Sequence, residues 1–168
     1  MTHAVRLLPV TPADEELVDA IFDRLAAYSM LAEGVAKATD AAREFLIGLP
    51  PGWPPSSKHV FAVTKDDGPV GLLDLINGYP ADGIVFVGLL AIAEDRHGEG
   101  IGRATQRLIE EFAQGLGATK LRLAVVEGNP AHAFWLKMGY SETGERKHHR
   151  GEARMTMVRL MEKPLLRP

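Results

Sequence analysis

The sequence contains no cysteine, and this absence removes a whole class of chemistry. Without a thiol the chain can form neither a disulfide nor a thiolate metal site, and it cannot carry an acyl group on an enzyme cysteine. The six histidines show no spacing typical of metal ligands, such as two histidines four residues apart with a glutamate between them. We therefore expect no metal site and no covalent thioester on the protein.

An excess of charge of one sign and a long hydrophobic run are also absent. The 19 lysines and arginines nearly balance the 22 aspartates and glutamates, which argues against the basic field with which nucleic-acid-binding proteins attract phosphates. The longest nearly unbroken apolar run, residues 84–93, is much shorter than the roughly 18 to 20 residues that span a bilayer. The N-terminal residues lack the apolar stretch of a signal peptide. We expect a soluble, cytoplasmic protein with neither nucleic acid nor membrane as a partner.

The length of 168 residues fits one compact domain, residues 1–168, which would bury roughly 70% of its unfolded surface. Helix caps and hydrophobic periodicity predict helices over residues 12–28, 39–47, 101–116 and 130–138. Strand patterns cover residues 5–8, 59–64, 70–76, 84–92, 121–126, 140–147 and 155–163, with hairpin turns predicted at 65–69 and at the basic cluster 146–150. Because the run 84–92 is apolar on both alternating faces, it is expected to be a central strand. These patterns predict an α/β fold with a mixed, mainly antiparallel sheet of about six to seven strands and flanking helices.

The segment with the clearest chemical meaning is Asp95–Arg103, between the predicted central strand and the helix that follows it. Its alternate glycines allow a tight turn with the N–H groups pointing inward, and the helix start behind them adds unpaired N–H groups and a positive dipole end. Such a loop is suited to bind an anion. Arg96, His97 and Arg103 also concentrate positive charge there.

Spacing excludes two common nucleotide loops. The dinucleotide fingerprint requires a glycine where the sequence has Arg103, and no Gly-Lys-Ser or Gly-Lys-Thr is present for a phosphate loop of NTPases. The segment instead resembles the pyrophosphate loop of the GNAT superfamily of acyl-CoA-dependent N-acetyltransferases, with His97, Gly100 and Gly102 at the pattern positions. A second stretch, Asn129–Tyr140, resembles another signature of that superfamily, and a predicted strand separates the two. The pair in this order makes the match more specific than either motif alone.

The resemblance implies a GNAT-like fold and acetyl-CoA as cosubstrate. The loop N–H groups would bind the pyrophosphate, the backbone of residues 90–92 would pair with pantetheine, and the amide of Leu90 or Ile92 would polarise the thioester carbonyl. Phe134 and Trp135 fit a cofactor wall or the core, and Arg103 fits phosphate binding or simple solvation. The implied cofactor-binding residues are Leu90, Ala91, Ile92, His97, Gly98, Glu99, Gly100, Ile101, Gly102, Arg103, Asn129, Phe134 and Trp135.

The catalytic groups are less evident. Trp135 occupies the slot where many members have a tyrosine as general acid, and indole has no proton to give at useful pH. The leaving thiol, with a pKa near 8.5, needs little help, whereas only about one lysine-like amine in 2,500 is neutral at pH 7. A base is therefore the greater need, and Asp74 and Glu127 are the candidates. Asp74 also fits a solvated position at a strand edge.

We expect direct transfer of the acetyl group from acetyl-CoA to a primary amine in a ternary complex, because no cysteine can form an intermediate. A catalytically inactive CoA-binding sensor or interaction module is the alternative. The resemblance places Tyr28 and Tyr79 in segments that border the acceptor pocket. The acceptor, whether a small molecule or a peptide, and a homodimeric state remain open.

Overall fold

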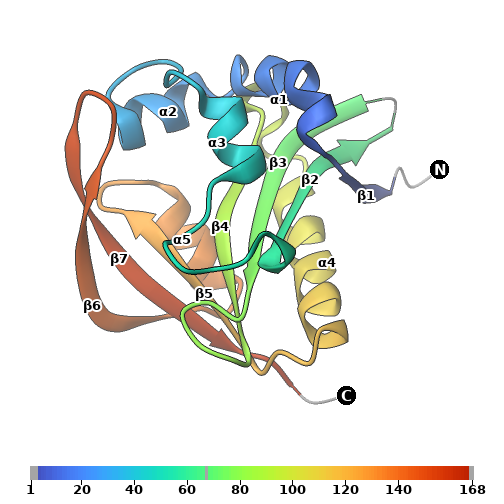
Figure 1. The fold of residues 1–168 in the computed structure, drawn as a ribbon, viewed down its shortest axis with the longest axis vertical. Coiled ribbons are helices and arrows are strands. Elements are labelled where there is room, and N and C mark those ends of the chain that lie inside the picture. The colour runs from blue at the N-terminus through green and yellow to red at the C-terminus, as the bar shows by residue number, and fades with distance from the viewer. Residues whose placement is uncertain (1–3, 67, 167–168) are drawn as a thin grey trace.

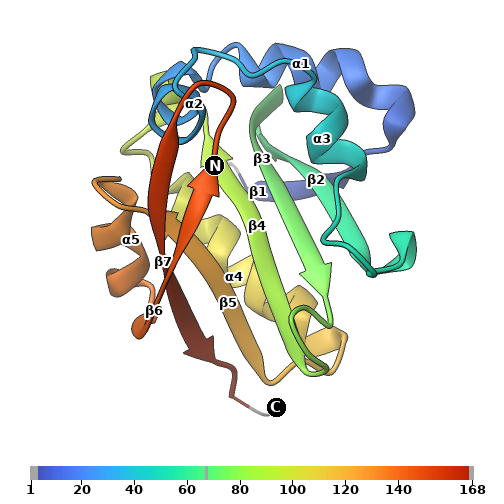
Figure 2. The same cartoon turned by 60° about the vertical axis from the view of Figure 1, so that its left-hand side comes forward.

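The computed structural model describes residues 4–66 and 68–166, so Asp67 of the predicted turn at 65–69 lies outside the described residues. The described residues form one seven-stranded sheet in the order β1-β2-β3-β4-β5-β7-β6, as Figures 1 and 2 show. The strands are β1 (Val5–Pro9), β2 (Lys58–Lys65), β3 (Gly68–Asn77), β4 (Ile84–Ile92), β5 (Lys120–Val126), β6 (Ser141–Arg150) and β7 (Met155–Pro164). Neighbours pair antiparallel except β4 and β5, which are parallel. The predicted mixed α/β fold is confirmed.

Helices cover both faces of the sheet. They are α1 (Glu15–Phe22), α2 (Ala26–Glu33), α3 (Ala41–Ile47), α4 (Ile101–Gly115) and α5 (Ala131–Lys137), with 3-10 turns at Pro12–Asp14, Pro55–Ser57 and Glu94–Arg96. Strand β3 contributes to two cores, because Leu73 and Leu75 pack with Ile109 of α4 whereas Leu72 packs with Phe22 of α1 and the helix α3. Asp74 alternates with these leucines and therefore belongs to the face of α1 and α3.

The helix predicted over 12–28 is two helices, because tertiary contacts interrupt it. Arg24, in the break, donates to the carbonyl of Pro69 at 2.9 Å and to the carboxylate of Asp95 at 3.2 Å. The N–H group of Ala27 donates to the carboxylate of Glu94, which stabilises the start of α2. The prediction of one continuous helix was therefore wrong, and α2 is tied to the loop after β4.

The predicted turn at 146–150 was also misplaced. These residues continue strand β6, and the reversal lies at residues 151–154. There the N–H of Gly151 donates to the carbonyl of Arg154 at 2.8 Å, and a Cβ on Gly151 would lie 2.4 Å from the carbonyl oxygen of Ala32. The tip of the β6–β7 hairpin is thus packed closely against α2.

Strands β4 and β5 separate along their length, and this separation opens the sheet. They pair only from Ile84 with Lys120 to Val87 with Leu123, although β4 continues to Ile92 and β5 to Val126. On the other side of β4, the register with β3 shifts after Asp74, which leaves one extra residue in β4. Within the described residues, no helix is long and apolar enough to cross a membrane.

Candidate active site

The loop between β4 and α4 has the geometry of an anion site. Gly98 and Gly100 have φ angles of +83° and +76°, in the region that glycine adopts without strain, and a Cβ on either would meet nothing within 4 Å. The first helical hydrogen bond of α4 runs from Ala104 N–H to the Gly100 carbonyl at 3.1 Å, so the N–H groups of residues 101–103 precede the intrahelical ladder. A Cβ on Gly102 would lie 3.2 Å from Phe134 Cζ, which shows how closely α5 approaches the loop.

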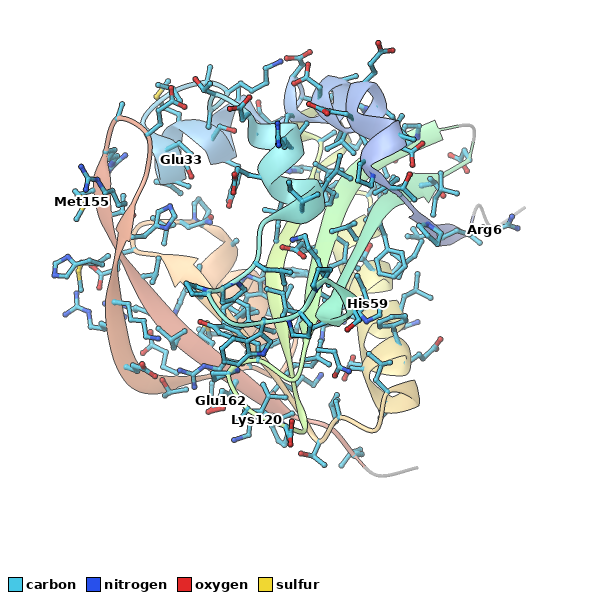
Figure 3. All side chains as sticks on the ribbon, viewed as in Figure 1. Arg6, Glu33, His59, Lys120, Met155 and Glu162 are labelled. Atoms are coloured by element: carbon cyan, nitrogen blue, oxygen red, sulfur yellow. The ribbon has the colours of Figure 1, made fainter. Side chains whose placement is uncertain are left out.

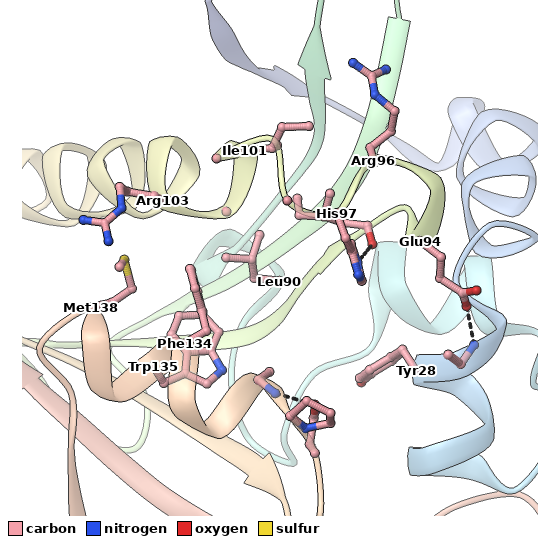
Figure 4. A pocket seen from close by; sticks show the side chains of 18 of the residues that line it. Tyr28, Leu90, Glu94, Arg96, His97, Ile101, Arg103, Phe134, Trp135 and Met138 are labelled. Carbon is pink, nitrogen blue, oxygen red and sulfur yellow. Dashed lines mark hydrogen bonds between the residues drawn. The ribbon is translucent and has the colours of Figure 1, made fainter.

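A large cleft of about 1060 Å³ lies between this loop, the end of β4, α2 and α5, and Figure 4 shows its side chains. Its lining includes most of the residues that the sequence implied for the cofactor, namely Leu90, Ile92, His97, Gly98, Gly100, Ile101, Gly102, Arg103, Asn129, Phe134 and Trp135. Ala91 lines a neighbouring cavity instead. Glu99 lines neither, because its carboxylate is directed to Arg96 and Lys65. Residues from three separate segments of the chain are therefore brought to one cleft.

The positive charge at the loop is distributed differently from the sequence expectation. Arg96 Nε donates to Glu99 at 2.7 Å and Lys65 Nζ to the same carboxylate at 3.2 Å. The Arg96 guanidinium, and then Lys65, hold the pKa of Glu99 down to about 2. Arg103 lines the cleft and forms no ion pair with any residue that the structure describes. Arg103 and Lys137, rather than Arg96, are thus the cations available to an anion in the cleft.

Two polar residues of the motifs brace the walls of the cleft. His97 Nε2 lies 2.8 Å from the carbonyl oxygen of Ile92, and a carbonyl only accepts, so this nitrogen carries the proton. The side-chain oxygen of Asn129 accepts a hydrogen bond from Ala131 N–H at 2.9 Å and stabilises the start of α5. Both side chains line the cleft while one of their polar atoms is engaged by the backbone.

A second cavity, which we call the wedge, fills the gap between the separated strands. It measures about 190 Å³ and is lined by residues 87–92 of β4 and 123–126 of β5. The wedge shares Leu90, Ile92 and Trp135 with the large cleft, so the two are adjacent. Trp135 is only 7% exposed and makes edge contacts with neighbouring aromatic rings. It therefore serves both the core and the cavity wall.

A third cavity, which we call the far cavity, lies on the opposite side of the wedge. It measures about 700 Å³ and is bounded by α1, α2, α3, the β3–β4 bulge and the β6–β7 turn. It shares Tyr28, Gly88 and Leu89 with the wedge. At the rim, Glu33 of α2 lies beside the β6–β7 turn (Figure 3) and accepts the N–H of Glu152 at 2.8 Å. The large cleft, the wedge and the far cavity therefore lie next to one another, each sharing lining residues with the next.

Asp74 lies in the far cavity and not at a strand edge, so the expectation of a solvated edge residue was wrong. Its side chain is 13% exposed, and its Oδ1 accepts from Nζ of Lys58 at 3.0 Å, where Lys58 is 5% exposed. Burial raises the pKa of Asp74, and Lys58 opposes this effect. A carboxylate in this setting can remain ionised and still take a proton.

The extra residue of the bulge makes room for this carboxylate. A Cβ on Gly88 would lie 2.6 Å from Asp74 Oδ2 and 3.1 Å from Cγ. Gly88→Ala is expected to displace Asp74 and to destabilise the fold by about 1 to 3 kcal/mol, measured by urea unfolding. Gly115→Ala is the matched control, since its Cβ would meet nothing within 4 Å at the end of α4. Equal stability of the two variants would contradict the close packing of Gly88 on Asp74.

The structure does not bring Glu127 to the same place. Its carboxylate accepts from Arg146 and, at 3.2 Å, from Nε of Arg159. The Arg146 guanidinium, with Arg159, lowers the pKa of Glu127 below its ordinary value. Glu127 lines none of the three cavities described above. Of the two carboxylates that the sequence offered as bases, only Asp74 faces a cavity.

Sequence reasoning missed Lys58 and Lys137, because nothing in the pattern links a strand lysine or a C-terminal helix lysine to a site. Tyr28, in a segment that the family resemblance placed beside an acceptor pocket, lines the far cavity. Tyr79 lines none of the three cavities and packs edge-on against Trp53, with ring centroids 4.9 Å apart. The break between α1 and α2, which places Tyr28, was not visible in the helical periodicity.

Comparison with known proteins agrees with this architecture. The sequence profile of the acetyltransferase (GNAT) family matches residues 46–140. An acetyltransferase from Thermus thermophilus is 30% identical, with a TM-score of 0.76 over 98% of this chain and 100% of that one. A GCN5-related N-acetyltransferase from Rhodopseudomonas palustris is 19% identical, with a TM-score of 0.70 over 98% and 97%.

A Bacillus subtilis acetyltransferase solved in complex with CoA is similar in fold, at 16% identity and a TM-score of 0.66 over 98% of this chain and 100% of that one. A search of curated sequences found no significant match. The profile spans more than half of the chain, and it includes the loop, the β4 and β5 residues that line the wedge, and α5. The chain therefore belongs to the GNAT acetyltransferase family.

Proposed function

We propose that the protein transfers the acetyl group of acetyl-CoA directly to a primary amine in a ternary complex. The observation that carries this proposal is the series of adjacent cavities, which extends from the glycine loop past the wedge to Asp74. A long anionic thioester fits the first two spaces, and an amine fits the third. No cysteine is present to take the acetyl group on the way.

The groups at the loop between β4 and α4 support the assignment of acetyl-CoA as the cosubstrate. The N–H groups of residues 101–103 and the cations Arg103 and Lys137 provide donors for phosphate oxygens. The unpaired edges of β4 and β5 beyond Val87 and Leu123 provide backbone groups along the wedge. These groups support the proposal that the loop binds the pyrophosphate and that β4 pairs with pantetheine.

At the far end, the amine nitrogen forms a bond to the thioester carbonyl carbon, and the carbon–sulfur bond breaks with its electron pair on sulfur. The amine proton must leave as the carbon–nitrogen bond forms, because the nitrogen then loses its basicity. We assign its removal to the carboxylate of Asp74, which borders the far cavity and is buried beside Lys58. An N–H group of β4, at Leu90 or Ile92, is proposed to polarise the carbonyl.

This proposal can be tested by measuring CoA binding and thiol release, because the protein has no cysteine. Calorimetry is expected to show binding of CoA and acetyl-CoA, and a thiol reagent is expected to record release of free CoA when an accepted amine is present. Because the protein has no thiol of its own, every thiol counted comes from CoA. No binding of either nucleotide at millimolar concentration would refute the proposal.

The same assay separates an enzyme from a CoA sensor. Trp135, which cannot donate a useful proton, is the residue that favours a sensor. Tight CoA binding together with no thiol release across a broad panel of amines would identify a binding module. Sustained release with any one amine would identify an acetyltransferase.

A further inference from the structure

Tyr28 occupies a position that no other described residue shares. Within the part of the chain that the structure describes, it alone lines the large cleft, the wedge and the far cavity together. Figure 4 shows its ring on the α2 side of the cleft, across from Trp135. If the proposed function holds, the thioester must lie where the cofactor spaces meet the amine space. Tyr28 therefore borders the place where the bonds change.

The ring of Tyr28 is held from two sides. It packs against the cluster that includes Val126 of β5 and Val158 of β7. The start of α2 is fixed by the contact between Glu94 and the N–H of Ala27, so the helix is tied to the anion-binding loop. The helix that carries Tyr28 is thus tied to the same loop that would bind the cofactor.

The hydroxyl of Tyr28 is free to act on a ligand. Within residues 4–66 and 68–166 it has no hydrogen-bond partner. The other two tyrosines differ, because Tyr140 donates to Gln106 at 3.2 Å and Tyr79 lies outside the three cavities. Tyr28 is half-buried, and a hydroxyl without a protein partner is a group that a bound molecule can satisfy.

Its ionisation limits the role that it can play. Burial, with the negative charges of Glu33 and Asp74, raises the pKa of Tyr28 to about 12. The phenol is therefore protonated throughout the neutral range, while a thiol has a pKa near 8.5. Full transfer of the phenol proton to a thiolate is uphill by this difference, whereas donation of a hydrogen bond is available at every pH of interest.

We propose that the hydroxyl of Tyr28 donates a hydrogen bond to the sulfur of CoA as the thiolate leaves. The carbon–sulfur electron pair remains on sulfur, the phenol keeps its proton, and the thiolate is protonated afterwards from solvent. Tyr28 is thus a catalytic residue that contacts a reacting atom, and it acts on the leaving group while Asp74 acts on the amine. This assignment rests on the proposed acetyl transfer.

Tyr28→Phe tests the assignment, because it removes the hydroxyl and keeps the ring in its packing. We expect kcat to fall by about 10- to 100-fold, with the KM values for acetyl-CoA and for the amine nearly unchanged. The shape of the pH profile should be the same as that of the original protein. Tyr79→Phe is the matched control and should leave kcat unchanged. An unchanged kcat in Tyr28→Phe, or a rise in the amine KM alone, would overturn the assignment.

A second measurement requires no amine acceptor. The thiol of bound CoA can be titrated by the ultraviolet absorbance of its thiolate, and the protein has no cysteine to interfere. A hydrogen bond to sulfur favours the thiolate, so bound CoA should have a thiol pKa about one unit lower in the original protein than in Tyr28→Phe. Equal thiol pKa values would refute the contact even if acetyl transfer is established. Absence of turnover with a lowered thiol pKa would refute only the proposed function.

Discussion

Replacing Asp74 by asparagine is expected to lower kcat for amine acetylation at pH 7 by about 10²- to 10⁴-fold. The asparagine amide cannot accept a proton from the amine, and near pH 7 only about one lysine-like amine in 2,500 is already neutral. The neutral fraction grows about tenfold with each pH unit below the pKa of the amine, near 10.4. The deficit of Asp74→Asn should therefore shrink as the pH rises. The measurement is the pH dependence of kcat for both proteins.

Two further variants make this result specific. Glu127→Gln should keep kcat near its original value, because Glu127 is held by two arginines outside the cavities. Asp74→Asn leaves Lys58 without its carboxylate partner in a buried position, and this alone can destabilise the fold. The double variant Lys58→Met and Asp74→Asn removes both charges and should fold while remaining slow. A slow Glu127→Gln with a normal Asp74→Asn would move the base to Glu127.

The ion pair between Lys58 and Asp74 should affect how kcat depends on pH. Lys58 opposes the effect of burial on Asp74, so Lys58→Met should raise the pKa of that carboxyl further above its ordinary value. The base works only when it is ionised. The acid limb of the kcat profile should then move to higher pH in Lys58→Met and stay in place in Lys58→Arg. The pH profile distinguishes this effect from a simple loss of stability.

The motif at residues 95–103 was sufficient to predict a tight glycine turn between a strand and a helix, because backbone conformation there depends on glycine at set positions. Gly98 and Gly100 both adopt positive φ angles, as the sequence implied. The order of the strands was predictable only from the resemblance to the GNAT superfamily. The apolar run 84–92 indicates a central strand, but the pattern does not indicate which strands lie beside it. The conformation of the loop could thus be predicted from the local sequence pattern, whereas the order of the strands could be predicted only from the resemblance to a family.

The features that sequence could not supply all depend on contacts distant in the chain. Asp74 is accommodated inside the protein because a bulge at Gly88 makes room for it, and Lys58 of the neighbouring strand β2 pairs with its carboxylate. The charge of Arg96 is neutralised by Glu99, although the sequence of this loop indicates a concentration of positive charge. Tyr28 is positioned by a helix break that Glu94, in the turn after β4, stabilises through the N–H of Ala27. Hydrophobic periodicity indicates which face of a helix or strand is apolar. It does not indicate which charged side chains form ion pairs.

Gly100→Asp is expected to abolish most of the affinity for CoA while leaving the fold intact. Asparagine and aspartate tolerate positive φ angles better than other residues, and a Cβ at this position would meet nothing within 4 Å. Gly100 precedes α4 in a left-handed conformation, with φ +76° and ψ 10°. The two substitutions therefore have nearly the same backbone cost. They differ only in the negative charge that aspartate brings to the loop.

Gly100→Asn is accordingly the matched control, and the comparison isolates electrostatics at the loop. A carboxylate about 5 Å from a phosphate, at the effective dielectric constant of a protein surface, costs about 2 to 3 kcal/mol, or roughly 30- to 150-fold in the CoA dissociation constant. Calorimetry of both variants should show this ratio, and added salt should reduce it because exposed charges are screened. Equal CoA affinities would mean that no phosphate binds at this loop. In that outcome the cofactor phosphates would have to contact Arg103 and Lys137 at another part of the cleft, which both side chains line.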